Sequence, residues 1–549
     1  MFHTPSSIIF KREVIVKRLS ERCSGNMADF EVLDRDLLAR IGRLKTRSGT
    51  IETPAFLPVI NPVKEAVTPK ELWENYGCKI LMTNAYIIKK HFNEGARELG
   101  VHRLLGFPGA IMTDSGAYQI LEYGEVGATN EEIIRYQEDI GSDIAVILDL
   151  PTGWNVTWDY AKYTVEETLR RARELWSIKS RGDIMWVGPV QGGRYVDLVA
   201  LSAREIGSLP FDIHALGSPT PVMEQYLFHI LVDMILTAKM NLPVERPFHL
   251  FGAGHPFMFS LVVALGCDLF DSAAYSIFAR EDRYITEYGT IRLEDLEYAP
   301  CSCPVCVKRS PRELREMPKT ERETEISRHN LYVCFAEIRR IKQAILEGRL
   351  WEYIEMRAHS HPALLQALKK LERYSDYVER VTPVVKRRGL FFFNSPLDFI
   401  RPETTRYERR LLERYTPPER ATTLLLIPDS ETKDNRRRRY LKKVISLVCK
   451  RYGLDPGSVH VCFCSPPFGV IPVELSEIYP LYQYEYAYPP NDEVIERVAE
   501  KVLRYVLITP YERVIMLVRE DSWSQRLADS CTKLFSERLL GKNILIFNI

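Results

Sequence analysis

Residues 110–120 read AIMTDSGAYQI, a short apolar run that breaks on an aspartate, a serine and a glycine. Apolar runs of this kind recur at roughly 20- to 40-residue intervals, with helix-forming stretches between them. Strands that are apolar almost throughout are typical of a parallel sheet buried on both faces. The repeat therefore predicts an α/β fold, a (β/α)8 TIM barrel. The eight runs are AFLPV (55–59), KILMT (79–83), AIMT (110–113), IAVIL (144–148), IMWVG (184–188), FDIHA (211–215), FHLFG (248–252) and CDLF (267–270).

Helix-start signals lie between these runs. The stretch Thr68–Glu71 offers an N-cap threonine, a proline in the first turn and a capping glutamate. Residues 129–132 and 164–167 each place a glutamate three positions after a threonine, the pattern of a capping box. We therefore expect helices to begin at these three places.

Polar residues follow most of the apolar runs. In a TIM barrel the carboxyl ends of the strands carry the active site, so these side chains are expected to meet in one pocket. An aspartate directly behind buried residues is costly unless it is hydrogen-bonded or used in chemistry. Some of these residues are expected to cap helices, but three aspartates and a glutamine are too many for caps alone. The residues are Asn84, Asp114, Asp149, Gln191, the Ala215-Leu216-Gly217 turn and Asp271.

A tight cysteine cluster, CSCPVC at 301–306, follows the predicted barrel, and His329 comes after its last cysteine with 22 residues between them. Three thiolates and one imidazole complete a tetrahedral set, which is typical of structural Zn²⁺. The sequence therefore predicts one zinc ion per chain, bound by Cys301, Cys303, Cys306 and His329. The pairs His359/His361 and Cys462/Cys464 are interpreted as turn or surface residues and as strand packing, respectively.

Composition limits the class of protein. The chain has 549 residues, 46% of them apolar and 27% charged, as in ordinary globular proteins of several domains. Its net charge of +1 requires any nucleic-acid surface to be a local patch. The longest apolar run, 257–270, is too short to span a membrane and contains Asp268. Scattered cysteines favour a reducing compartment, so we expect a cytoplasmic protein.

The motifs together resemble those of the tRNA-guanine transglycosylases. They are LARIGRLKTRSGTIETPAFLPV (38–59), MTDSGAYQ (112–119), QEDIGSDIAVILDLP (137–151), VQGGRY (190–195), HALGSP (214–219), LFDSAAY (269–275) and CSCPVC. The closest similarity is to the archaeal, archaeosine-type branch, which inserts 7-cyano-7-deazaguanine at position 15 of the tRNA D-loop. Seven motifs in the same order make the resemblance specific, whereas one alone is weak.

The resemblance implies a double displacement at the ribose, comparable to that of retaining glycosidases. A carboxylate attacks C1′ as guanine leaves, and the incoming base then attacks the covalent ribosyl-enzyme. Matched to the family motifs, Asp271 is the favoured nucleophile and Asp114 the general acid/base. The opposite assignment of these two residues also fits the motifs.

The resemblance also implies a guanine pocket. Asp149 would accept hydrogen bonds from the N1–H and 2-amino groups of guanine, and Gln191 would donate to O6. Main-chain groups of Ala215, Leu216 and Gly217 would complete the pocket, with Ser115 beside Asp114. The expected ligands are tRNA, guanine and 7-cyano-7-deazaguanine.

Changes in composition predict four segments. Residues 1–27 are a basic extension, disordered or mis-annotated, with a transit-like leader as the alternative. Residues 28–300 form the barrel, 301–375 a zinc-binding subdomain, and 376–549 an α/β region that contacts tRNA. In this last region Arg436–Arg439 suit phosphate contact, although a solvated helix face explains them equally well.

Archaeal members of the family usually end in a PUA domain, a small β-barrel that grips tRNA. Residues 470–549 contain one glycine, Gly541, and no glycine-punctuated strands, so we expect no PUA domain. A separate PUA-type partner or a compensating basic surface would then hold the tRNA. Because the family commonly pairs through the zinc region, a homodimer is also expected.

Three alternatives remain at this point. The first is a queuine-type enzyme that exchanges guanine in the anticodon loop. The second is a paralogue of the archaeosine synthase type, against which the presence of both Asp114 and Asp271 argues. The third is a non-catalytic tRNA-binding subunit, which would not need the guanine pocket of Asp149 and Gln191.

Overall fold

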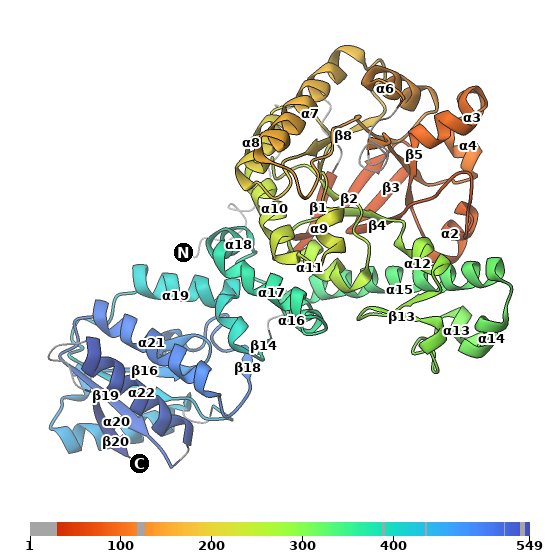
Figure 1. The fold of residues 1–549 in the computed structure, drawn as a ribbon. Helices are drawn as coiled ribbons and strands as arrows, with labels where there is room; N and C mark the ends of the chain where they lie inside the picture. The colour runs from red at the N-terminus through yellow and green to blue at the C-terminus, as the bar shows by residue number, and fades with distance from the viewer. Residues whose placement is uncertain are drawn as a thin grey trace, which may run out of the picture.

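The computed structural model describes residues 30–117, 127–386, 390–433, 436–520, 522–538 and 544–548. Predictions for the N-terminal extension therefore lie outside the described residues. A three-stranded antiparallel sheet comes first, made of β1 (Phe30–Asp36), β2 (Ala39–Thr46) and β3 (Gly49–Thr53). It leads directly into the large α/β unit in the upper part of Figure 1.

The eight predicted runs form one parallel sheet, so the barrel prediction is confirmed. The strand order is β4-β11-β10-β9-β8-β7-β6-β5. The ring closes where Val59, just after β4, pairs with Met82 of β5, and Ile60 N donates to Met82 O at 2.8 Å. The strands are β4 (Ala55–Pro58), β5 (Ile80–Asn84), β6 (Ala110–Asp114), β7 (Ile144–Val146), β8 (Met185–Val190), β9 (Ile213–Leu216), β10 (Phe248–Leu250) and β11 (Leu269–Ser272).

Helices surround this sheet because each buries an apolar stripe against it. Two of the three predicted helix starts are confirmed: Thr68 caps α2, and Thr129 forms a complete capping box with Glu132 at α6. The helices of the barrel are α2 (Pro69–Tyr76), α3 (Ala85–Leu99), α4 (Val101–Leu105), α6 (Asn130–Asp139), α7 (Trp158–Ile178), α8 (Val196–Gly207), α9 (Thr220–Glu224), α10 (Phe228–Asn241), α11 (Phe259–Ala264) and α12 (Ala274–Arg280).

The predicted helix start at Thr164 is wrong. Helix α7 begins earlier, at Trp158, and Thr157 is its N-cap, accepting a hydrogen bond from Tyr160 N. Thr164 is buried inside the helix, where its hydroxyl donates to Ala161 O at 2.7 Å. A threonine inside a helix can bond back to the preceding turn in this way. The capping pattern alone therefore did not identify the residue at which the helix begins.

The segment after the barrel contains the long helix α15 (Lys319–Glu347), which packs against β1, β2, β4, α11 and α12. In Figure 1 it runs along the lower side of the barrel towards α13 and α14. The other elements of this segment are β12 (Arg283–Ile285), β13 (Thr290–Arg292), α13 (Pro304–Lys308), α14 (Pro311–Glu316), α16 (Leu350–Ala358), α17 (Pro362–Lys370), α18 (Ser375–Val381), β14 (Phe391–Phe393) and α19 (Pro402–Arg414).

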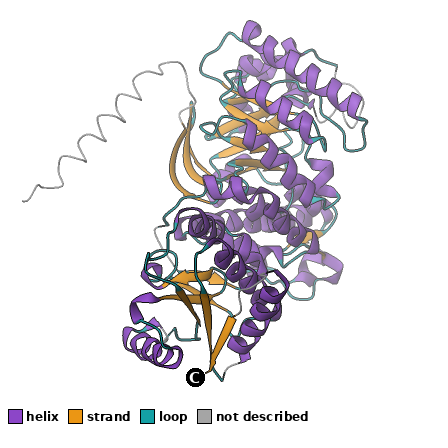
Figure 2. Cartoon of the chain, turned by 90° about the vertical axis from the view of Figure 1, so that its left-hand side faces the viewer, coloured by secondary structure: helices purple, strands orange, loops and turns teal. Residues whose placement is uncertain are grey.

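The C-terminal region is a separate α/β unit with its own apolar core. Its sheet has the order β17-β16-β15-β19-β20, and only the β16–β17 pair is antiparallel. Helices lie on both sides of the sheet (Figure 2). The elements are β15 (Thr423–Pro428), α20 (Arg438–Tyr452), β16 (Val459–Ser465), β17 (Gly469–Pro472), β18 (Tyr484–Tyr486), α21 (Asp492–Ile508), β19 (Arg513–Val518), α22 (Ser522–Arg538) and β20 (Ile544–Asn548).

This sheet is open, with β17 and β20 at its edges. Within the described residues after 390, the strands form it and a two-stranded β14–β18 ladder, and no closed PUA-type barrel occurs there. None of the helices in the described parts of the chain is both long and apolar enough to cross a membrane.

Candidate active site

The predicted site residues lie at the carboxyl ends of barrel strands. Asp114 ends β6, Asp149 and Gln191 follow β7 and β8, and Asp271 lies in β11. Burial raises the pKa of Asp114 to about 7, and the nearby charges of Asp149 and Asp271 contribute to that rise. The structure therefore brings the three carboxylates together at one end of the barrel.

Two groups donate hydrogen bonds to one carboxylate oxygen of Asp114. Asn84 Nδ2 donates to Oδ2 at 3.0 Å, and Gly116 N donates to the same oxygen at 3.2 Å. The amide oxygen of Asn84 also caps α3 by accepting from Ile87 N. Asn84 thus links the start of a barrel helix to the orientation of Asp114.

Asp271 is held in a similar way. His249 Nε2 lies 2.8 Å from Asp271 Oδ1, and Gly252 N donates to the same oxygen at 3.1 Å. Since carboxylate oxygens accept hydrogen bonds, the tautomer that fits this contact donates through Nε2. Sequence reasoning did not assign His249 to the site, since it lies inside the apolar run FHLFG rather than at its end. A histidine within a barrel strand is the signal that would have identified it.

Asp149 and Gln191 form a direct pair. Gln191 Nε2 donates to Asp149 Oδ2 at 2.5 Å, and Gln191 Oε1 accepts from Thr152 N and from Ser218 Oγ, both at 3.0 Å. Burial raises the pKa of Asp149 to about 6, and the hydrogen bond from Gln191 opposes that rise.

Three further predicted residues, Ala215, Leu216 and Gly217, lie next to this pair. Ala215 and Leu216 are buried in β9, and Gly217 N donates to Val190 O at 2.9 Å. A Cβ atom at Gly217 would lie 2.2 Å from Gln191 Nε2, so a side chain there would displace the amide. The backbone of this turn therefore lies directly against Gln191.

Ser115 is fully buried beside Asp114, and its hydroxyl has no hydrogen-bond partner among the described residues. A buried polar group without a partner is costly, and such groups are found where a ligand or water completes the bonding. The position is consistent with the predicted role of Ser115 in binding a base.

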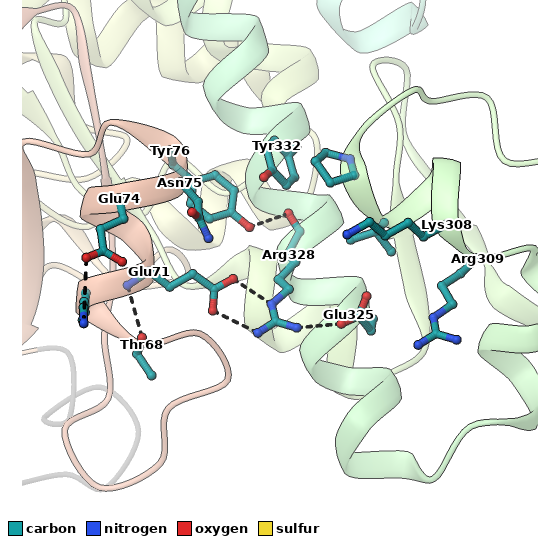
Figure 3. Close-up of a pocket in the computed structure, with 13 residues that line it drawn as sticks. Thr68, Glu71, Glu74, Asn75, Tyr76, Lys308, Arg309, Glu325, Arg328 and Tyr332 are labelled. Carbon is teal, nitrogen blue, oxygen red and sulfur yellow. Dashed lines mark hydrogen bonds and ion pairs between the residues drawn. The ribbon is translucent and has the colours of Figure 1, made fainter.

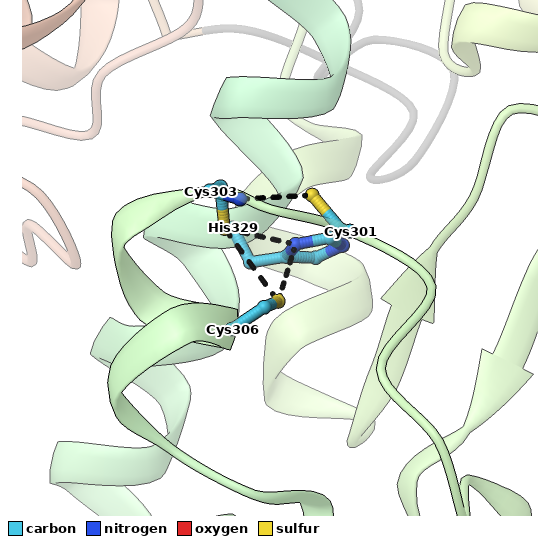
Figure 4. A group of neighbouring side chains, drawn as sticks. All are labelled: Cys301, Cys303, Cys306 and His329. Atoms are coloured by element: carbon cyan, nitrogen blue, oxygen red, sulfur yellow. Dashed lines mark hydrogen bonds between the residues drawn. The ribbon is translucent and has the colours of Figure 1, made fainter.

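The predicted metal ligands also converge (Figure 4). The ligand atoms of Cys301, Cys303, Cys306 and His329 all lie within 4.8 Å of one another. His329 Nδ1 lies 3.5 Å from Cys303 Sγ and 3.4 Å from Cys306 Sγ, whereas Nε2 lies 2.8 Å from Ile285 O. This arrangement fits a metal ion, because the second nitrogen of a ligating histidine usually donates to a carbonyl.

A cavity of about 600 Å³ lies beside this cluster, between α2 and α15 (Figure 3). Its charged groups are largely paired with one another: Arg328 contacts Glu71 at 2.7 Å and Glu325 at 2.6 Å. None of the three strand-end carboxylates lines it. The candidate chemistry therefore lies at the strand ends and not in this cavity.

Comparison with known proteins gives two matches to family models. Residues 35–363 match the model described as queuine tRNA-ribosyltransferase, and residues 404–538 match a domain of unknown function, DUF5591. Curated relatives include a tRNA-guanine(15) transglycosylase from Saccharolobus solfataricus, 43% identical over 89% of this chain and 97% of its own length. A protein of the same name from Aeropyrum pernix is 44% identical over 87% and 92% of the two chains.

Proposed function

Because the chain belongs to the queuine tRNA-ribosyltransferase family, we propose that it is a tRNA-guanine transglycosylase that acts at position 15 of the D-loop. It would replace guanine there with 7-cyano-7-deazaguanine. The observation that carries this proposal is the meeting of Asp114, Asp149 and Asp271 at the strand ends of the barrel. The names of the relatives favour the D-loop over the anticodon loop, and the intact carboxylates argue against a binding-only subunit.

The proposed reaction uses Asp271 as the nucleophile. The oxygen Oδ2 attacks C1′ of the ribose while His249 and Gly252 hold Oδ1. The bond from C1′ to guanine breaks, and Asp114 supplies the proton to the leaving base. The incoming base then loses a proton to Asp114 and attacks C1′, which releases Asp271. A pKa of about 7 suits Asp114 to both steps, because a group that titrates near working pH can donate and accept.

Asp149 and Gln191 are proposed to recognise the base. Their mutual hydrogen bond orients both side chains before a ligand enters. An ionised Asp149 would accept from the two donors on the edge of guanine, and the turn Ala215–Gly217 would contribute main-chain groups. Ser115, whose hydroxyl has no partner within the described parts of the chain, would gain one when a base is bound.

The first prediction tests the activity itself. Purified protein incubated with tRNA and radiolabelled guanine is expected to incorporate the label at one nucleotide, position 15. Nuclease digestion and separation of the fragments would map that nucleotide. Label in the anticodon loop would replace this proposal with the queuine-type alternative, and no label in any tRNA would contradict transglycosylation.

We propose that the metal of the Cys301/Cys303/Cys306/His329 cluster is structural Zn²⁺, since four protein ligands leave no position for a substrate. Homodimer formation remains a prediction from the resemblance, a separate PUA-type partner one from the expected lack of a PUA domain, and a cytoplasmic location one from the scattered cysteines.

We also propose that helix α20 contacts the tRNA backbone. Its exposed side chains include Arg438, Arg439, Lys442 and Lys443, and residues 438–452 contain no aspartate or glutamate. Arg436 differs from these four residues in its burial and in its partners. It is partly buried, with Nε at 3.0 Å from Asp429 Oδ1 and Nη2 at 2.7 Å from Tyr484 OH, and so stabilises the C-terminal unit.

The second prediction follows from the contrast between the exposed side chains of α20 and the partly buried Arg436. The triple variant Arg438→Ala/Arg439→Ala/Lys442→Ala is expected to weaken tRNA binding and to lower its salt dependence, because fewer counterions are released. Fluorescence anisotropy titrations at several salt concentrations would measure both. Arg436→Ala, as the contrasting variant, should lower thermal stability instead. An unchanged salt slope in the triple variant would assign this face of α20 to solvent.

A further inference from the structure

Exposed aromatic side chains gather where helix α7 begins. Trp158, Tyr160 and Tyr163 are 41, 47 and 54% exposed, respectively. The rings of Tyr160 and Tyr163 lie 6.1 Å apart at 46°. A cluster of large exposed apolar groups on a protein surface marks an interaction site, whereas single ones need no explanation.

This cluster lies on the rim of the candidate active site. Helices α7 and α8 follow strands β7 and β8, so their first turns lie at the carboxyl face of the barrel. Trp154 comes five residues after Asp149, and Arg194 three residues after Gln191. Since a fully extended chain spans at most about 3.6 Å per residue, these side chains originate within roughly 18 and 11 Å of the base-recognition pair.

The two loops are joined to each other. Thr152 N donates to Gln191 Oε1 at 3.0 Å, and Tyr195 OH donates to Val156 O at 2.8 Å. Trp158 Nε1 donates across the same junction to Asp197 Oδ2 at 2.9 Å. These hydrogen bonds join Trp158 and Tyr195 to the same two segments that carry the predicted guanine pocket.

Two cations lie against these rings: Lys162 Nζ is 5.7 Å from the ring centre of Trp158, and Arg194 lies beside Trp154 and Tyr195. Arg194 Cζ lies 5.8 Å from the ring centre of Trp154 and 5.3 Å from that of Tyr195. The guanidinium is exposed and has no carboxylate partner in the described parts of the chain. Lys162, by contrast, is paired with Glu166 at 3.7 Å. Flat aromatic faces beside an available arginine suit unpaired nucleotides, whose bases stack and whose phosphates carry negative charge.

We propose that Trp154, Trp158, Tyr160, Tyr163, Arg194 and Tyr195 form a rim platform that stacks the unpaired nucleotides flanking the exchanged base. The proposal rests on the proposed function, because it takes the RNA to be the substrate whose base enters the barrel. Pulling a base out of its stack costs stacking free energy for that base and its neighbours. Stacking on the rings of the rim platform recovers part of the stacking free energy that the RNA loses. Arg194 contacts an adjacent phosphate.

The third prediction compares matched double variants. Tyr160→Leu/Tyr163→Leu is expected to raise the Kd and the KM for tRNA by about 5- to 150-fold, the loss measured for one stacked base. The KM for guanine and the salt slope should not change. Tyr160→Phe/Tyr163→Phe keeps the aromatic faces and should behave as wild type. Arg194→Ala should instead reduce the salt slope by about one phosphate contact.

Titrations with tRNA and guanine-exchange assays on the same preparations decide the result. A leucine variant with wild-type Kd and KM for tRNA, beside a wild type that exchanges guanine, would overturn the rim platform and leave the proposed function intact. Loss of affinity in the phenylalanine variant as well would assign the effect to the hydroxyls and would also overturn stacking. A wild type that exchanges no guanine would contradict the proposed function, while the Kd series would still test the rim platform.

Discussion

Asp271→Asn is expected to abolish guanine exchange and to leave no protein–RNA adduct that survives denaturation. An amide oxygen cannot form the ester to C1′ that the proposed route requires. His249 and Gly252 would still hold the side chain, so the loss would come from chemistry and not from misplacement. The measurement is exchange of labelled guanine together with denaturing gel electrophoresis of enzyme mixed with labelled tRNA.

Asp114→Asn is expected to slow exchange by about 10²- to 10⁴-fold, the usual cost of losing a general acid or base, while some adduct still forms. The variant Asp295→Asn, which alters an exposed carboxylate in the segment after β13, outside the barrel strands, should exchange guanine as wild type does. Adduct in Asp271→Asn with none in Asp114→Asn would exchange the two roles.

Both aspartate variants should remain folded. Burial and the neighbouring carboxylates raise the pKa of Asp114 to about 7, compared with about 3.9 in an unfolded chain. Because folding raises the pKa of Asp114, the protonated carboxyl contributes its full stabilisation below about pH 4. This stabilisation is lost as the pH rises from about 4 through 7. The amide introduced by Asp114→Asn does not titrate. Wild type should therefore lose stability relative to this variant between about pH 4 and pH 7 in denaturant titrations.

Cys303→Ser is expected to release the bound metal and to lower the stability of the folded chain. Structural zinc sites contribute roughly 10–16 kcal/mol of apparent folding free energy, comparable to the whole net stability of a typical domain. Cys303 Sγ lies 3.5 Å from both Cys306 Sγ and His329 Nδ1, so its replacement removes one of the four metal ligands. The expected results are the loss of about one metal ion per chain by mass spectrometry and a lower Tm.

Cys334→Ser provides the matched control. Cys334 is also a buried thiol, on the same helix α15 as His329, but it is not one of the clustered ligands. Its replacement should leave the metal content unchanged. Full metal retention by Cys303→Ser would contradict the four-ligand site.

The amino-acid sequence determined the barrel, the metal cluster and the set of polar strand ends. Each of these depends on short-range patterns. A run such as IAVIL is typical of a strand buried on both faces, and the spacing of CSCPVC brings its thiols together within a few residues. Asp114, Asp149 and Gln191 were found for the same reason, since the first two directly follow an apolar run and Gln191 comes three residues after one.

Features that depend on contacts between distant segments became visible only in the folded chain. His249 belongs to the site only because β10 and β11 are neighbours in the sheet, which places its imidazole against Asp271. Arg436 and Arg438 look alike in the sequence, yet Arg436 pairs with Asp429 and Tyr484 while Arg438 is exposed. A side chain's role depends on what surrounds it, and those surroundings come from segments far apart in the chain.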